Sequence, residues 1–306
     1  MHTVGYILSH SFSGSTLLTL ALAAHSEIAT VGELVGVNVR ILSDEQAALD
    51  YLCSCGEKVA ECPFWKELSA RLERQGVEFR HPRLGTRFTL SSIPFLNQVL
   101  VCSLRNQALE NVREWLVQSI PPFRQRFKKI AATNAVAVEQ VLRMAGKKVL
   151  IDESKSHVRF VRLASIPTLN VRPIFLTRDG RGVAMSARNR GVMDFAHAAK
   201  SWARFNKNAE RMIAATTHAC LHVRYEDLCA QPSDTLQKIH RFLGLNPEPW
   251  PPPKRLFEHH ILGNDMRLRF DGTITFDARW QRELTEQELQ IFSQSTGNMN
   301  GHFGYE

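Results

Sequence analysis

The chain has 306 residues, 44% of them hydrophobic and 22% charged, which is long enough for a large core and ordinary for a globular protein. Its net charge of +8 favours an anionic ligand, but the basic residues form no long tail, so we expect no nucleic-acid partner. Six cysteines are too few for a disulfide scaffold and favour a reducing, cytoplasmic location. The apolar segment 17–24 follows no Lys or Arg, and no stretch approaches the roughly 18 apolar residues of a membrane span, so we expect neither a signal peptide nor a span.

Short buried strands alternate with helices along the chain. Apolar runs predict strands at residues 4–9, 148–151, 171–177 and 220–224. Helix-compatible segments follow at residues 15–24, 157–164, 181–188 and 233–243. The remaining predicted elements are helices at 63–75, 101–129 (broken at Pro121 and Pro122) and 284–293, and a Pro-rich loop at 247–253. The alternation predicts one α/β domain, residues 1–306, with three α/β/α layers, a central parallel sheet and a helical insert at about 40–130.

A turn rich in Ser and Gly joins the first strand to the first helix. Its central residues are Ser13, Gly14, Ser15 and Thr16. Backbone N–H groups in such a turn lie at the positive end of a helix dipole, so the turn suits a phosphate. The spacing and the Lys of a Walker A loop are absent, which argues against an ordinary ATPase or kinase. A capped helix after an ordinary turn remains the alternative, because Ser is a good N-cap residue.

A second candidate phosphate site follows the predicted strand at 171–177. Arg178 ends this strand, and Ser186 lies eight residues later, on the next helix. A guanidinium fork can bind a phosphate through two hydrogen bonds, and Ser186 can point back to the same anion. The alternative is a solvated turn in which Asp179 caps the helix.

Taken in order, these segments resemble the sulfotransferase family. Residues 11–18, SFSGSTLL, are similar to the P-[RK]-S-G-[ST]-[ST]-L-L loop that binds the 5′-phosphosulfate end of 3′-phosphoadenosine-5′-phosphosulfate (PAPS). Residues 178–186, RDGRGVAMS, resemble the R-D-P-R-x-x-x-x-S segment that binds the nucleotide 3′-phosphate. Tyr-Glu-Asp-Leu from Tyr225, Phe-Leu-Gly-Leu at 242–245, and Trp202 with Asn206 match further parts of the family pattern. The resemblance runs from residue 4 to about 245, and the motifs are most similar to those of bacterial and tyrosyl-protein sulfotransferases.

The resemblance implies a P-loop NTPase-like fold and an enzyme that moves a sulfuryl group from PAPS to a hydroxyl or amine. The product nucleotide would be 3′-phosphoadenosine-5′-phosphate (PAP), and the acceptor a small molecule, a carbohydrate or a peptide. The implied PAPS-binding residues are Ser13, Gly14, Ser15, Thr16, Arg178, Ser186 and Tyr225. Residues 40–130 and 247–306 are expected to shape the acceptor pocket, and the oligomeric state is left open.

In-line sulfuryl transfer needs a base for the acceptor and positive charge at the transferring group. By the resemblance, Glu33 takes the acceptor proton and Lys155 touches the sulfuryl group. A carboxylate can act so when burial raises its basicity towards the working pH. Both residues could instead be solvated surface side chains, and His10 and His25 are weaker candidates for the base.

One position departs from the family pattern. Phe12 stands where the family has an Arg or Lys that neutralises the leaving phosphate. We expect backbone amides, the helix dipole and Lys155 to carry this charge. The departure leaves open a catalytically impaired relative that binds a nucleotide or a sulfoglycan. A small-molecule kinase is a third reading, disfavoured by the missing Walker Lys.

Three of the cysteines are close in sequence but match no zinc motif. Cys53 and Cys55 are separated by one residue instead of two to four, and Cys62 is the only further thiol nearby. We therefore expect packing or a structural turn at these positions, and no metal.

Overall fold

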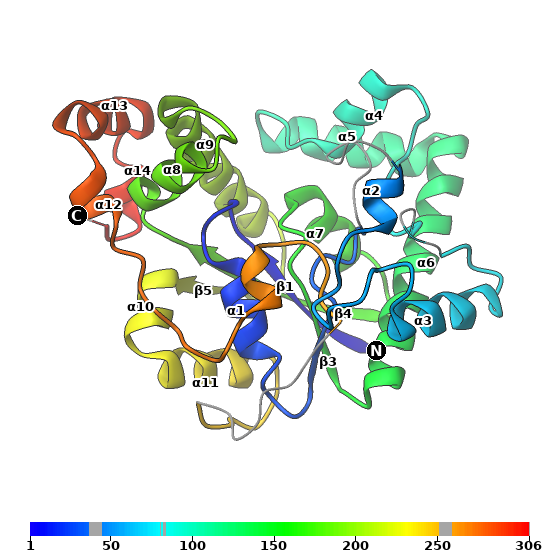
Figure 1. Ribbon diagram of the computed structural model, residues 1–306. Helices are drawn as coiled ribbons and strands as arrows, with labels where there is room; N and C mark the ends of the chain where they lie inside the picture. The colour runs from blue at the N-terminus through cyan, green and yellow to red at the C-terminus, as the bar shows by residue number, and fades with distance from the viewer. Residues whose placement is uncertain (37–44, 80, 82–83, 251–258, 306) are drawn as a thin grey trace.

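The computed structural model describes residues 1–36, 45–79, 81, 84–250 and 259–305 (Figure 1). Its centre is a parallel sheet of five strands in the order β2-β3-β1-β4-β5. The strands are β1 His2–Leu8, β2 Ile28–Thr30, β3 Val149–Asp152, β4 Leu169–Thr177 and β5 Leu221–Arg224. In register, Val4 of β1 lies between Leu150 of β3 and Val171 of β4. The predicted α/β fold with a parallel sheet is confirmed, and β2 is a strand that the sequence analysis did not predict.

The sheet is buried on both faces, which explains its nearly continuous apolar strands. Alternate residues of β1 point to opposite sides. Tyr6 and Leu8 join a core that also contains residues of helices α6, α7, α8 and α9, whereas Ile7 joins a second core with residues of α1 and α11. The bounds of these helices are α1 Ser15–Leu22, α6 Pro121–Ala145, α7 His157–Ala164, α8 Gly180–Asn189, α9 Phe195–Ala214 and α11 Pro232–Phe242. Helices therefore pack on both faces of the sheet, with one core on each face, as in the predicted α/β/α arrangement.

Further helices precede β3 and lie together on the right of Figure 1. They are α2 Glu45–Leu49, α3 Pro63–Glu73, α4 Pro94–Val101 and α5 Gln107–Ser119. The helical segment predicted over 101–129 starts too early, because α4 ends at Val101 and Asn106 caps a new helix, α5, through its side chain. The break predicted at Pro121 and Pro122 is confirmed, since α5 ends at Ser119 and α6 begins at Pro121. Pro121 falls in the first turn of α6, where its missing N–H costs no hydrogen bond. Helix α6 continues past residue 130 to Ala145 and ends at Gly146, whose φ of 63° suits a C-cap.

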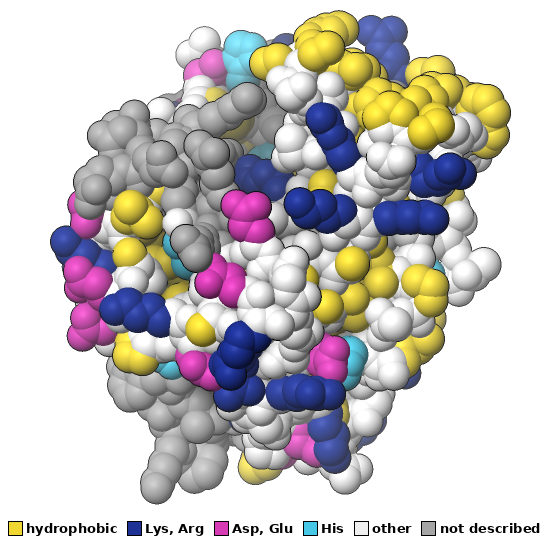
Figure 2. Space-filling view, turned by 90° about the vertical axis from the view of Figure 1, so that its right-hand side faces the viewer, with side chains coloured by type: hydrophobic (Ala, Val, Ile, Leu, Met, Phe, Trp, Pro, Cys, Tyr) yellow, Lys and Arg dark blue, Asp and Glu magenta, His cyan; other side chains and the backbone are white. Residues whose placement is uncertain are grey.

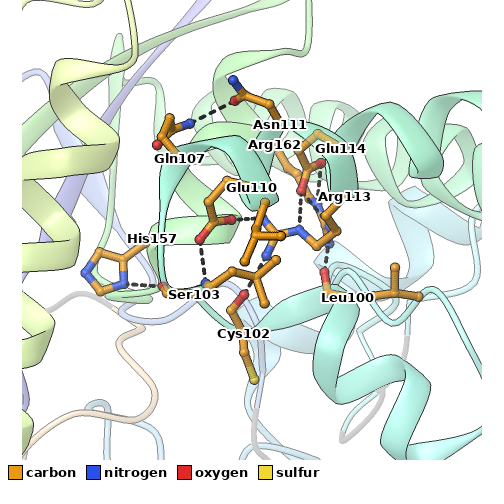
Figure 3. A network of polar contacts seen from close by, with 12 residues as sticks. Leu100, Cys102, Ser103, Gln107, Glu110, Asn111, Arg113, Glu114, His157 and Arg162 are labelled. Atoms are coloured by element: carbon orange, nitrogen blue, oxygen red, sulfur yellow. Dashed lines mark hydrogen bonds and ion pairs between the residues drawn. The ribbon is translucent and has the colours of Figure 1, made fainter.

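A network of buried charges fixes α5 to the rest of the molecule (Figure 3). Arg113 of α5 contacts Glu110 and Glu114, and Glu114 accepts two hydrogen bonds from Arg162 of α7, at 3.0 and 3.1 Å. Arg162, 1% exposed, also donates to the carbonyl of Leu100 at the end of α4. The network therefore holds α4 and α5 in place beside α7.

The C-terminal part returns across the carboxyl ends of the strands. After α10 (Tyr225–Ala230) and α11, the described elements are η1 Asp265–Leu268, α12 Trp280–Glu283, α13 Glu286–Thr296 and α14 Met299–His302. Helix α13 starts two residues later than predicted, because Thr285 forms a capping box with Glu288. Of the predicted Pro-rich loop, residues 247–250 are neither helix nor strand, and 251–253 lie outside the described residues. No helix in the described part of the chain combines the length and apolar character needed to cross a membrane.

Candidate active site

A cavity of about 1500 Å³ opens at the carboxyl ends of the central strands, the usual ligand site of an open parallel sheet. The loops after β1, β3 and β4 form its floor, and residues of α4, α8 and the segment 262–279 form its walls. Of the residues that the sequence analysis nominated, those that line the cavity are Gly14, Ser15, Thr16, Glu33, Lys155, Arg178, Ser186 and Tyr225. Ser13 lies below the surface, 1% exposed, and its Oγ has no hydrogen-bond partner among the described residues.

The loop after β1 packs closely against Tyr225. Gly14 has φ of 89°, and a Cβ built on it would lie 2.5 Å from the Tyr225 ring. Only glycine therefore fits there, both for its backbone conformation and for the approach of the ring. Helix α1 starts at Ser15 with no side-chain cap, so the first-turn N–H groups have no partner within the helix. The hydroxyl of Thr16 accepts a hydrogen bond from the N–H of Asn264 at 3.0 Å, which ties the loop to the C-terminal wall.

The two candidate catalytic residues contact each other. Lys155 Nζ donates to Glu33 Oε1 over 2.7 Å, and the two side chains are 16% and 20% exposed. Burial lowers the pKa of Lys155, but Glu153 and Glu33 more than offset this and leave the pKa above its ordinary value. Lys155 has φ of 62°, a left-handed conformation that is uncommon for a non-glycine residue and often found at functional sites. The pair therefore presents a charged ammonium and a carboxylate side by side in the cavity.

Below this pair lies Glu153, which the sequence analysis did not nominate. Its fully buried carboxylate contacts His260 Nε2 at 2.9 Å and accepts a hydrogen bond from Thr19 at 3.2 Å. Burial raises the pKa of Glu153, but Lys155, His260 and the Thr19 hydroxyl outweigh burial and hold the pKa at about 2. An acidic residue two positions before Lys155 was the available signal in the sequence. At neutral pH Glu153 is thus a charged anchor under Lys155.

Arg178 connects several parts of the cavity. Its NH1 donates to the carbonyl of Phe12 at 3.0 Å, and its NH2 donates to the Asp277 carboxylate at 3.1 Å. The guanidinium also lies over the Tyr225 ring, 4.5 Å from its centre. Arg279 shares the Asp277 carboxylate, and the two arginines help to hold the pKa of Asp277 well below its usual range, against the opposing effect of burial. The Arg178 guanidinium is thus hydrogen-bonded to the backbone of Phe12 and to the Asp277 carboxylate, where the sequence analysis predicts a phosphate.

Ser186 of α8 lines the cavity, and so does Arg190, which directly follows the helix, one turn later. The Ser186 hydroxyl donates to the carbonyl of Gly182 at 2.8 Å. Arg190 is exposed, and its guanidinium lies 5.8 Å from the centre of the Phe12 ring. The four-residue spacing from Ser186 was the signal for Arg190, and the sequence analysis missed it. A cation therefore lies near the position where the family pattern has a loop Arg or Lys.

The two histidines considered as alternative bases do not line the cavity. His10 contacts Ser201 Oγ at 3.1 Å, and burial lowers its pKa. His25 contacts the carbonyl of Asn246 at 2.8 Å and packs on His240, with ring centres 4.4 Å apart. Both rings therefore have structural partners away from the Lys155–Glu33 pair.

The wall that contains α4 carries apolar side chains. Phe88 and, from α4, Pro94, Phe95 and Val101 line the cavity, next to the polar Asn97 and Gln98. The outer surface of α4 and α5 is apolar as well, with Phe95 77%, Trp115 65% and Val112 52% exposed. Figure 2 shows hydrophobic side chains gathered at the top of this face of the molecule, where Figure 1 has α4 and α5. The cavity thus combines a basic floor with one apolar wall.

A parallel sheet of this order, a loop rich in Ser and Gly between its central strand and the first helix, and a cavity beyond it define a P-loop-like α/β protein. The family model described as "Sulfotransferase family" matches residues 98–252, half of the chain. The chain therefore belongs to the sulfotransferase family, a family of transferases. The matched segment includes Lys155, Arg178, Ser186 and Tyr225, whereas the loop and Glu33 lie before it.

The chain is similar to solved structures as well. The sulfotransferase domain of the olefin synthase of Synechococcus PCC 7002 is 20% identical, has a TM-score of 0.51, and the alignment covers 100% of this chain and 95% of that one. The sulfotransferase domain from the curacin biosynthetic pathway is 18% identical, with a TM-score of 0.49 and coverage of 100% and 99%. At these identities the first likeness supports the fold alone. No curated protein sequence matches the chain.

Proposed function

We propose that the protein transfers a sulfuryl group from PAPS to a hydroxyl or amine acceptor. The observation that carries the proposal is the contact between Lys155 and Glu33 in the same cavity as the loop, Arg178 and Ser186. These residues are far apart in the sequence and have complementary chemistry: a proton acceptor, a cation and two candidate phosphate sites.

The residues fit the nucleotide at two ends. The loop offers first-turn N–H groups of α1 and the buried hydroxyl of Ser13, which has no hydrogen-bond partner in the described part of the chain; both suit the 5′-phosphosulfate. Arg178 and Ser186 would bind the 3′-phosphate. For this, Arg178 exchanges its contact with Asp277 for the phosphate, and the Ser186 hydroxyl turns away from Gly182. Tyr225 keeps both the loop and Arg178 in position.

The acceptor reacts at the Lys155–Glu33 pair. The acceptor oxygen or nitrogen forms a bond to sulfur, the bond between sulfur and the leaving phosphate oxygen breaks, and the acceptor proton passes to Glu33. An ammonium has three N–H donors, so Lys155 can hold Glu33 and a sulfuryl oxygen at the same time. Glu153 keeps Lys155 charged during this step. The apolar wall of Phe88, Pro94 and Phe95 suits an acceptor with an apolar part.

Arg190 is our candidate for the cation that the loop lacks at Phe12. Its guanidinium lies over the Phe12 ring and lines the cavity, so it can neutralise charge on the leaving phosphate. The alternative of a catalytically impaired binding protein has a specific observation in its favour, because the Arg178 fork already holds Asp277. Measured transfer to any acceptor decides between the two.

A thermal-shift comparison of PAP, ADP and ATP tests the nucleotide. If Arg178 and Ser186 read the 3′-phosphate, PAP at a hundredfold excess over its Kd adds about 2.7 kcal/mol to the unfolding free energy. ADP, which lacks the 3′-phosphate, should stabilise much less at the same concentration. Equal shifts with PAP and ADP contradict the proposal, and a larger shift with ATP favours the kinase.

A further inference from the structure

Three thiols and one imidazole converge outside the catalytic cavity. They are Cys53, Cys55, Cys62 and His259, and their ligand atoms all lie within 4.8 Å of one another. Cys53 and Cys62 are buried, whereas Cys55 and His259 are partly exposed. The sequence analysis expected no metal because it counted three thiols and found one residue, instead of two to four, between Cys53 and Cys55. The fourth group, His259, comes from a segment nearly 200 residues further along the chain, and only the fold brings it to the thiols.

The distances fit a tetrahedral metal. With zinc–sulfur and zinc–nitrogen bonds of about 2.3 and 2.05 Å, tetrahedral angles separate two sulfurs by about 3.8 Å, and a sulfur from a nitrogen by about 3.6 Å. Cys55 Sγ and Cys62 Sγ are 3.7 Å apart. His259 Nδ1 lies 3.3 Å from Cys62 Sγ and 3.8 Å from Cys53 Sγ. A disulfide would need about 2.05 Å between two sulfurs, so the present spacing suits a shared ion.

The backbone around the thiols is arranged as a compact turn. Gly56, with φ of 94°, closes a turn in which its N–H donates to the carbonyl of Cys53 at 3.0 Å. The N–H of Cys62 donates to the carbonyl of Lys58 at 2.8 Å, at the start of α3. The His259 ring stacks on Phe64, with ring centres 4.7 Å apart, which fixes the direction of its Nδ1. These contacts help to orient Cys53, Cys62 and His259.

We propose that Cys53, Cys55, Cys62 and His259 bind one structural Zn²⁺ ion. On binding, the three thiols release their protons to water and the ion takes four protein ligands. A Cys₃His set without an open position is typical of a structural zinc site. The soft thiolates favour zinc over magnesium or calcium, which prefer oxygen ligands.

The site has a clear structural task. Next to His259, His260 contacts Glu153, and the carbonyl of Ile261 accepts a hydrogen bond from the N–H of Glu33 at 3.3 Å. Gly263 and Asn264, a little further on, line the catalytic cavity. Zinc therefore fastens residues 53–62 to the start of the segment that supports Glu33 and Glu153. This assignment is independent of the reaction that the cavity carries out.

Metal analysis of the full-length protein tests the proposal. The protein should carry no His tag and should be purified with a thiol reductant and dialysed without chelator. We expect about one zinc per chain by mass spectrometry. After exchange for Co²⁺, we expect a thiolate-to-cobalt charge-transfer band and the strong visible bands of a tetrahedral ion. Less than a tenth of an equivalent of zinc, no uptake of added Zn²⁺ and a cobalt spectrum without thiolate bands overturn the proposal.

Variants at the partly exposed ligands identify the site. His259→Ala and Cys55→Ser should each weaken zinc affinity by more than about 100-fold, since even removing a hydrogen bond to a ligand costs 10- to 100-fold. Cys102→Ser is the matched control, because Cys102 is an exposed thiol outside the cluster and should keep the metal. Zinc retained at wild-type affinity in both ligand variants contradicts the assignment, as does a disulfide between Cys55 and Cys62 in the purified protein.

Chelation provides a readout that does not depend on the variants. A strong zinc chelator should lower the melting temperature of the wild type by at least about 5 °C. It should also speed amide hydrogen exchange in residues 52–62 and 259–264, and added Zn²⁺ should reverse both effects. No change in either property means that no structural ion is present.

Discussion

Lys155→Ala removes the ammonium that contacts Glu33 while it keeps the local backbone. Lys and Ala both carry a Cβ, so the cost of the left-handed conformation at this position stays the same. The effects of the substitution therefore report on the charge and on the hydrogen bond to Glu33. Catalysis and stability should both change, and the two effects can be measured separately.

The catalytic loss should be large. If Lys155 meets charge that develops on the sulfuryl oxygens, its removal should lower turnover by about 10²–10³, as for other single electrostatic donors. PAP has already lost the sulfuryl group, so its affinity should change by much less. Transfer of labelled sulfate from PAPS to water or to an acceptor mixture measures the first effect, and calorimetry with PAP measures the second.

The stability loss follows from Glu153. Its pKa is about 2 in the folded protein and 4.5 ordinarily, and this difference corresponds to about 3 kcal/mol of stability at neutral pH. Of the groups that lower the pKa of Glu153, Lys155 has the largest effect. Removing Lys155, and with it the Glu33 contact, should therefore lower the free energy of unfolding by about 2–4 kcal/mol. The folded pKa is depressed, so this stabilisation is complete above pH 4.5 and is lost as the pH falls towards 2.

Urea unfolding of wild type and variant at pH 7 and pH 3 checks this reasoning. The free energy of unfolding should differ more between wild type and variant at pH 7 than at pH 3. Lys148→Ala is the control: its ammonium pairs with Glu27 and is 72% exposed, so we expect less than about 1 kcal/mol and full turnover. Unchanged turnover in a folded Lys155→Ala protein would refute the catalytic role of Lys155. A stability difference that does not depend on pH would refute its coupling to Glu153.

Six further variants probe the rest of the cavity. Arg178→Ala should weaken PAP binding about 10- to 100-fold in calorimetry, and Arg178→Lys should recover only part of this because Lys lacks the fork; unchanged binding with an intact fold would remove Arg178 from the phosphate site. Glu33→Gln should keep PAP affinity but lower transfer by about 10²–10⁴, and near-normal turnover would assign the base elsewhere. Arg190→Ala should lower turnover, and the double variant Phe12→Arg with Arg190→Ala should restore part of it; failure of both expectations means that Arg190 does not replace the loop cation. Gly14→Ala should lower stability by about 1–2 kcal/mol or more and abolish PAP binding, because its methyl group would overlap the Tyr225 ring; a wild-type melting temperature would contradict this packing.

Much of the fold could be predicted from local patterns. Apolar runs of four to seven residues, each followed by a helix-compatible segment, located four of the five strands to within about two residues at either end. The short strand Ile28–Thr30 was missed, because three apolar-compatible residues carry too little periodicity to stand out. The break between α4 and α5 was also missed, because residues 102–106 contain neither Gly nor Pro and only the side chain of Asn106 marks the new helix.

The candidate site also contains features that the sequence predicted and contacts that only the structure reveals. The loop at residues 13–16 and the pair Arg178 and Ser186 could be found from the sequence, because a turn composition and an eight-residue spacing are local properties; their roles stay predictions. The contact of Lys155 with Glu33, the anchor that Glu153 forms with His260, and the approach of Arg190 to Phe12 join residues 107 to 178 positions apart. The meeting of His259 with three thiols about 200 residues earlier is of the same kind. Turn chemistry and helical period act over a few residues, whereas these contacts depend on how the strands are ordered and how the helices pack on the sheet, and only the tertiary structure decides that.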